Sequence, residues 1–185
     1  VNLGELNYRR CLFAKQYLYK DSWDKLFSFA FSREPEDRVI SMFYYLFITN
    51  NTPIVTLAKE FVRNKKIYIG TSSKFDLFLD WIEKIHYEDK SHIVDRFVVS
   101  HTAPMFPDVA DDDGNILLKK IYRIDNLYSA VEEIFETCGI EQNIKVSDIR
   151  KNVNKKRKNY QPSKSQLNRI QKLYSKDYDI YERAS

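Results

Sequence analysis

The segment from Phe27 to Ser41, FSFAFSREPEDRVIS, gathers side chains that can bind an anion. Arg33 and Arg38 supply guanidinium groups, and Ser41 supplies a hydroxyl three residues after Arg38. Guanidinium groups donate paired hydrogen bonds to phosphate or sulfate oxygens, and a hydroxyl can add one more. The residue types and their spacing therefore indicate a site for a phosphate-like anion.

The elements predicted around this segment would position these groups. Alternating aromatics predict a half-buried or buried strand over residues 27–32, and Pro35 suits the first position of a helix. Arg33 then follows the carboxyl end of the strand, while Arg38 and Ser41 share one face of the helix. The positive end of the helix dipole would favour a bound anion as well. The helix is predicted from an apolar stripe: Val39, Met42, Phe43 and Leu46.

The same charges allow a simpler interpretation. Arg33 and Arg38 can lie at a solvated helix end, where Glu34, Glu36 and Asp37 would be their partners. The residue types alone leave both interpretations open.

The rest of the chain is predicted to be mostly helical. A helix follows caps at residues 71–73, and another should run from Leu127 to Cys138, with Asn126 and Gly139 as its caps. A last helix should start near Ser163 with a capping box and reach Tyr181. A second strand is predicted over residues 117–124. His101 lies in a predicted loop or strand end, and Cys138 falls on an apolar stripe, which favours a buried, reduced thiol.

Length and composition favour one globular domain. The chain has 185 residues, 43% of them hydrophobic and 15% aromatic, so we predict a single domain over residues 1–185. No apolar run approaches the roughly 18 residues that a membrane helix needs. His86 and His92 have no further ligands at metal-binding spacing, so no metal is expected.

Further short motifs follow one another along the chain. In order, they are Trp23-Asp24 with Phe27; Phe75, Phe78, Leu79 and Trp81; His101 with Pro104; Ile121 to Leu127; and Tyr174 with Asp177 and Tyr178. With the Arg-x-Pro-x-x-Arg-x-x-Ser segment, this order resembles the sulfotransferases of the carbohydrate type, which use 3′-phosphoadenosine 5′-phosphosulfate. One departure is Asp125, which stands where that family usually has Glu.

The resemblance implies an α/β domain of the P-loop-type sulfotransferase fold, with a parallel sheet flanked by helices. It implies transfer of a sulfuryl group from 3′-phosphoadenosine 5′-phosphosulfate to a hydroxyl of a carbohydrate acceptor. The family's 5′-phosphosulfate loop, Lys-Thr-Gly-Gly-Thr-Ser or similar, has no counterpart among the four glycines of this sequence. We therefore expect the first strand and loop to be missing from a sequence that begins at Val1. A pseudoenzyme that keeps nucleotide binding is an alternative.

The resemblance also implies roles for particular residues. Arg33 and Ser41 would bind the 3′-phosphate of the donor. His101 would be the base that takes the proton of the acceptor hydroxyl, because a neutral imidazole suits that task, although a Glu or Asp could serve equally.

The basic stretch from Arg150 to Lys158 carries six positive charges in nine residues. By resemblance it is the loop that closes over the nucleotide, where Lys156 and Arg157 would reach the 3′-phosphate or an anionic glycan. It could instead bind nucleic acid through phosphate contacts, or form a solvated loop. A nucleic-acid partner is not expected, since a net charge of +4 is modest for a dedicated binder.

Overall fold

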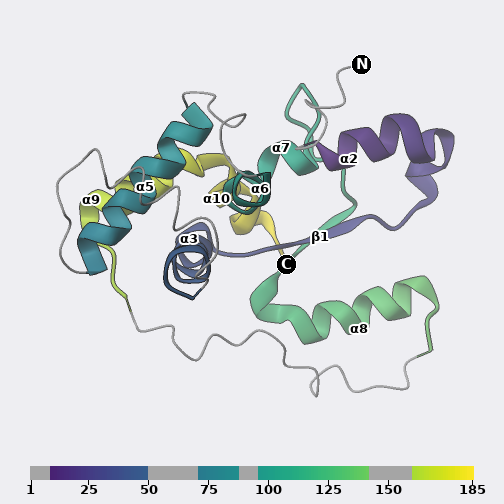
Figure 1. The fold of residues 1–185 in the computed structure, drawn as a ribbon. Helices are drawn as coiled ribbons and strands as arrows, with labels where there is room; N and C mark the ends of the chain where they lie inside the picture. Colours follow the sequence, from purple (N-terminus) through teal and green to yellow (C-terminus); the bar gives the residue numbers. More distant parts are fainter. Residues whose placement is uncertain (1–8, 50–70, 88–95, 142–159) are drawn as a thin grey trace. The chain divides into compact units, whose positions relative to one another are not determined.

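The computed structural model describes residues 9–49, 71–87, 96–141 and 160–185 (Figure 1). The chain divides into two compact units. Unit 1 comprises Val1–Glu34, Pro104–Lys155 and Lys176–Ser185, and unit 2 comprises Pro35–Ala103 and Lys156–Ser175. The first boundary, between Glu34 and Pro35, lies inside the predicted anion-binding segment. A single domain over residues 1–185 stays a prediction.

Two parallel strands form the sheet of unit 1. Strand β1 (Phe29–Ser32) pairs with strand β2 (Lys120–Arg123), so that Phe29 lies opposite Lys120 and Ser32 opposite Arg123. Both strands are shorter than predicted. Phe29 is 39% exposed while Ser32 is buried, so β1 is half-buried. Parallel strands among helices confirm the predicted α/β class.

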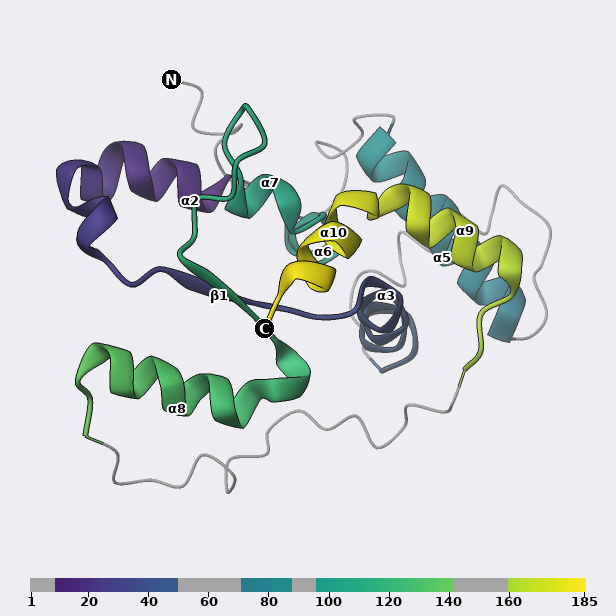
Figure 2. The ribbon, with the colours of Figure 1, turned by 180° about the vertical axis from the view of Figure 1, so that it is seen from behind.

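Helix α8 (Leu127–Cys138) runs along one side of these strands (Figures 1 and 2) and has the predicted bounds. Its Ala130 and Ile134 pack against Tyr122 of β2 in a buried cluster. Gly139 ends the helix in the left-handed conformation, at φ 65°, which glycine adopts without steric strain. The prediction of a buried Cys138 is wrong: its side chain is exposed, because the last turn of α8 extends past this cluster.

The remaining described elements of unit 1 are helical, and a tight turn precedes β2. Gly114 adopts φ 86° in this turn, and the Asn115 side chain donates to the Asp111 carboxylate over 3.1 Å. Arg10 joins two of the elements through an ion pair with Asp108. The elements are α2 (Arg10–Phe13), a π-helical segment (Ala14–Tyr19), two 3₁₀ segments (Lys20–Lys25 and Ile124–Asn126), α7 (Phe106–Val109) and α10 (Ser175–Arg183).

The regular elements in the described part of unit 2 are all helical. Pro35 begins α3, as its position in the sequence predicts, and the helix expected after residues 71–73 is α5. The core is aromatic and aliphatic and includes Val39, Phe43, Leu46, Phe75, Phe78, Ile82 and Ile170. The elements are α3 (Pro35–Phe43), a π-helical segment (Tyr44–Thr49), α5 (Thr71–Tyr87), α6 (Arg96–Thr102) and α9 (Lys164–Leu173).

Helix α9 is fastened to α5 by side chains. Arg169 donates to Asp80 over 2.6 Å and to Glu83 over 2.8 Å, and these carboxylates raise the pKa of Arg169. The predicted capping box is present, since Ser163 and Gln166 each accept the other's backbone N–H. The predicted single last helix is wrong: the backbone leaves helical geometry at Tyr174 (φ −118°, ψ 27°), between α9 and α10.

No helix within these described ranges has the length and the apolar character needed to cross a membrane.

Asp177 is a buried carboxylate of α10 that holds the start of α7. It is 3% exposed and accepts the backbone N–H groups of Met105 (2.8 Å) and Phe106 (2.9 Å). Because an Asn amide nitrogen cannot accept, Asp177→Asn should leave one of these N–H groups unpaired and lower the free energy of unfolding by about 1 to 3 kcal/mol. Urea unfolding measures this. The control, Asp179→Asn on the exposed side of the same helix, should change it by less than about 0.5 kcal/mol; equal effects of the two variants would contradict the assignment.

Candidate functional site

The carboxyl ends of β1 and β2 form one edge of the sheet in unit 1. The register places Ser32 opposite Arg123, and Arg33 follows directly after Ser32. In open parallel sheets, ligands bind at this edge. Two residues with guanidinium groups, Arg33 and Arg123, therefore lie at the edge where an anion would be expected.

Arg33 lies in a partly desolvated environment. Its side chain is half-buried, and burial lowers the pKa of Arg33, while the charge of Asp125 acts in the opposite direction. An arginine stays protonated despite such a shift. Because water screens it less, a half-buried guanidinium attracts an anion more strongly than an exposed one does.

Asp125, at the position where the motif usually has Glu, is held by α10. The Tyr181 hydroxyl donates to Asp125 Oδ2 over 3.0 Å. Burial raises the pKa of Tyr181, and the hydrogen bond to Asp125 raises it further, so this hydroxyl stays protonated as a donor. Asp125 thus acts on Arg33 through its charge and is bound to α10 through Tyr181. Its place in the sequence did not predict this role.

Arg123 is engaged by α10 too. Its Nε donates to the Tyr181 carbonyl over 3.2 Å and its Nη2 to the Glu182 carbonyl over 3.3 Å, while the guanidinium carbon lies 4.6 Å from the centre of the Tyr181 ring. These carbonyls belong to the last turn of the helix, which has no intrahelical donors left for them. Arg123 therefore caps α10.

In unit 2, Arg38 binds the end of another helix. Its guanidinium donates to the carbonyl of Ala103, just past α6, and lies 5.5 Å from the centre of the Tyr174 ring. Ser41 is half-buried on α3. Because Arg33 belongs to unit 1 and Ser41 to unit 2, a shared phosphate between them stays a prediction.

His101 lies in α6, and the prediction of a loop or a strand end for it is therefore wrong. Its side chain is exposed, and its ring lies nearly parallel to that of Tyr45, with ring centres 5.9 Å apart and an angle of 22° between the planes. The Ser100 hydroxyl is 3.4 Å from its Nδ1. An exposed imidazole is accessible to an acceptor hydroxyl, as a general base must be.

The helix turn that carries His101 is held at Thr102, which is fully buried. Tyr174 donates its hydroxyl to the Thr102 carbonyl over 2.7 Å, and His86 Nε2 lies 3.0 Å from the Thr102 hydroxyl. Tyr174 opens the Tyr-x-x-Asp-Tyr motif, and Thr102 lies within the His-x-x-Pro motif. Two motifs far apart in the sequence are therefore in contact within unit 2.

Two predicted site residues, Lys156 and Arg157, lie outside the described residues. Across the ranges that the structure does describe, no group of three or more His, Cys, Asp or Glu side chains could hold a metal ion.

A sequence model described as the Sulfotransferase family matches residues 6–182. The chain belongs to the sulfotransferase family. The match includes Arg33, Ser41 and His101, and membership makes the protein a sulfotransferase, an enzyme that transfers a sulfuryl group. No curated protein and no solved structure matches the chain.

The half-buried side chain of His86 should make the folding stability of this sulfotransferase depend on pH. Burial and the charge of Arg38 lower the pKa of His86 to about 4 from 6.5. The unfolded chain then binds a proton that the folded chain rejects, so stability should fall as the pH drops from about 6.5 toward 4. Between about pH 7 and pH 4.5, the wild type should lose about 2 kcal/mol more than His86→Gln, whose amide does not titrate.

Urea unfolding of both proteins at the two pH values measures this difference. The same loss of stability in the variant and the wild type would show that His86 is not the group that takes up the proton.

Proposed function

We propose that this sulfotransferase uses 3′-phosphoadenosine 5′-phosphosulfate as donor and a hydroxyl of a carbohydrate as acceptor. One observation carries the proposal: Arg33 follows the carboxyl end of β1, and α3 begins two residues later at Pro35. An arginine that comes between a strand and the start of a helix in the sequence supports this proposal, because a guanidinium donates paired hydrogen bonds to phosphate and a helix N-terminus favours an anion.

Arg33 and Ser41 hold the 3′-phosphate in this proposal. The fork of Arg33 can donate two parallel hydrogen bonds to phosphate oxygens, and the hydroxyl of Ser41 can donate one. These bonds fix the position of the donor nucleotide and take no part in bond making, so their effect is on orientation. Lys156 and Arg157 add positive charge toward the 3′-phosphate or an anionic glycan; their role rests on the sequence alone.

The transfer itself requires one proton to be removed. The acceptor hydroxyl oxygen forms a bond to sulfur while the bond from sulfur to the bridging phosphate oxygen breaks, and the nucleotide leaves as adenosine 3′,5′-bisphosphate. His101 takes the hydroxyl proton, because an imidazole nitrogen can accept a proton as a general base. The bonds that Thr102 and Ala103 receive from Tyr174 and Arg38 fix the turn that carries this imidazole.

A second candidate function is polyanion binding through the basic stretch from Arg150 to Lys158. It is favoured by the net charge of +4 and by the density of lysine and arginine there. Such binding depends steeply on salt, whereas a nucleotide held by a few oriented groups depends on salt only moderately. The two functions therefore respond differently to the same titration.

Arg33→Ala should weaken the binding of adenosine 3′,5′-bisphosphate by about 1.5 to 3 kcal/mol, the range for hydrogen bonds to charged groups. Ser41→Ala should cost less, about 0.5 to 1.5 kcal/mol. Isothermal titration calorimetry at about 0.15 M salt measures both. Lys25→Ala, which removes an exposed lysine of unit 1, is the control and should leave the affinity unchanged.

Three outcomes would decide against the proposal. Equal affinities for adenosine 5′-phosphate and the bisphosphate would remove the 3′-phosphate assignment. An unchanged affinity in Arg33→Ala would remove Arg33 from the site. Binding of an oligonucleotide at the same salt, abolished by neutralising Lys155 to Lys158 and without a response to the bisphosphate, would establish the polyanion binder.

A further inference from the structure

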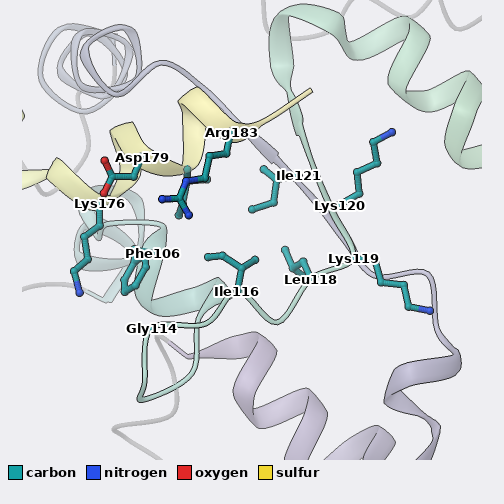
Figure 3. Close-up of a pocket in the computed structure, with 11 residues that line it drawn as sticks. Phe106, Gly114, Ile116, Leu118, Lys119, Lys120, Ile121, Lys176, Asp179 and Arg183 are labelled. Atoms are coloured by element: carbon teal, nitrogen blue, oxygen red, sulfur yellow. The ribbon is translucent and has the colours of Figure 1, made fainter.

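A cavity lies in unit 1, away from the edge that carries Arg33. Its volume is about 350 Å³, and its walls come from α7, the turn at Gly114, the start of β2 and α10 (Figure 3). The lining residues that matter below are Phe106, Ile116, Ile121, Lys176, Asp179 and Arg183.

The cavity is at the opposite end of the sheet from the proposed donor site. Its wall includes Lys120, the first residue of β2, whereas Arg33 follows the last residue of β1. The strands are parallel, and each has four residues, so the two ends are separated by roughly 13 Å of strand. The cavity is therefore distinct from the donor site.

Arg183 supplies a positive charge to this cavity. Figure 3 shows its side chain extending from α10 toward Ile116 and Phe106. The side chain of Arg183 makes no hydrogen bond or ion pair with any residue in the described parts of the chain, although Asp179 lies one turn before it on α10. Its five N–H donors are thus available to a ligand.

The other cations of the cavity have different roles. Lys120 is engaged in an ion pair with Glu133, and Figure 3 shows Lys119 and Lys120 pointing away from Arg183. The ammonium of Lys176 lies 4.3 Å from the centre of the Phe106 ring. Lys176 therefore adds a positive charge beside Phe106. The two positive charges of Lys176 and Arg183 outweigh the single negative charge of Asp179.

Apolar side chains form much of the remaining wall. Ile116 is 37% exposed, and it lines the cavity together with Phe106 (Figure 3). Covering such surface with an apolar group releases water, at about 25 cal/mol for each Å² buried. A ligand for this cavity should consequently combine an anionic group with an apolar body.

We propose that this cavity binds a small organic anion, in which a sulfate or carboxylate group is held by Arg183 and an apolar ring lies against Ile116 and Phe106. The volume, about 350 Å³, is near the lower end of the range for small-molecule sites, which fits a ligand of about one ring. The planar guanidinium matches both sulfate and carboxylate with paired hydrogen bonds.

Phenyl sulfate is the probe. Inorganic sulfate is the control for the anionic group alone, and phenol is the control for the ring alone. Titration of the whole chain, followed by NMR, should shift the amide signals of Gly114 and Ile121, and phenyl sulfate should bind at least tenfold more tightly than either part. Shifts that exclude these amides, or an affinity of inorganic sulfate equal to that of phenyl sulfate, would overturn the proposal.

Variants separate the two halves of the site. Arg183→Gln should weaken phenyl sulfate at least tenfold, since it removes a charged donor and disturbs no bond within the described structure. Ile116→Ser should weaken phenyl sulfate and leave inorganic sulfate unchanged, and Asp179→Asn should tighten both. Arg33→Ala is the matched control and should have no effect. An unchanged affinity in Arg183→Gln, or a loss in Arg33→Ala equal to that in Arg183→Gln, would show that the ligand binds elsewhere.

Discussion

The parallel pairing of β1 and β2 is the constraint on which the candidate site depends. It joins Phe29 to Lys120 and Ser32 to Arg123, segments about ninety residues apart in the sequence. Parallel strands direct their carboxyl ends to the same edge, so Arg33 and Asp125 come to lie in one environment. Helix α8 supports the pairing because Ala130 and Ile134 bury Tyr122 of β2.

Several residues of the sulfotransferase motifs hold backbone groups of the chain. Arg38 and Tyr174 donate to the carbonyls of Ala103 and Thr102 in unit 2, and Asp177 accepts the N–H groups of Met105 and Phe106 in unit 1. A buried peptide group without a partner is costly, so each of these side chains stabilises a turn that regular secondary structure leaves unpaired. The motifs therefore include residues that hold the backbone as well as Arg33 and Ser41, which we propose bind the donor.

The sequence predicted those helix ends that are set by residues next to them in the chain. Pro35 begins α3, Gly139 ends α8, and the box at Ser163 caps α9, because each of these acts on the backbone beside it. Tertiary contacts decided the rest. Nothing near Arg38 in the sequence points to Ala103 as its partner. Cys138 is exposed because the buried cluster under α8 ends before it. Asp125 entered the candidate site for the same reason, through Tyr181 on a distant helix.

The central claim is that Arg33, at the carboxyl end of β1, binds the 3′-phosphate of the sulfuryl donor. A crystal structure of the chain with adenosine 3′,5′-bisphosphate tests it most directly. The account predicts 3′-phosphate oxygens within about 3 Å of the Arg33 guanidinium nitrogens, the distance for a charge-assisted hydrogen bond. A bisphosphate bound with its 3′-phosphate away from Arg33, or in the cavity beside Arg183, would contradict it.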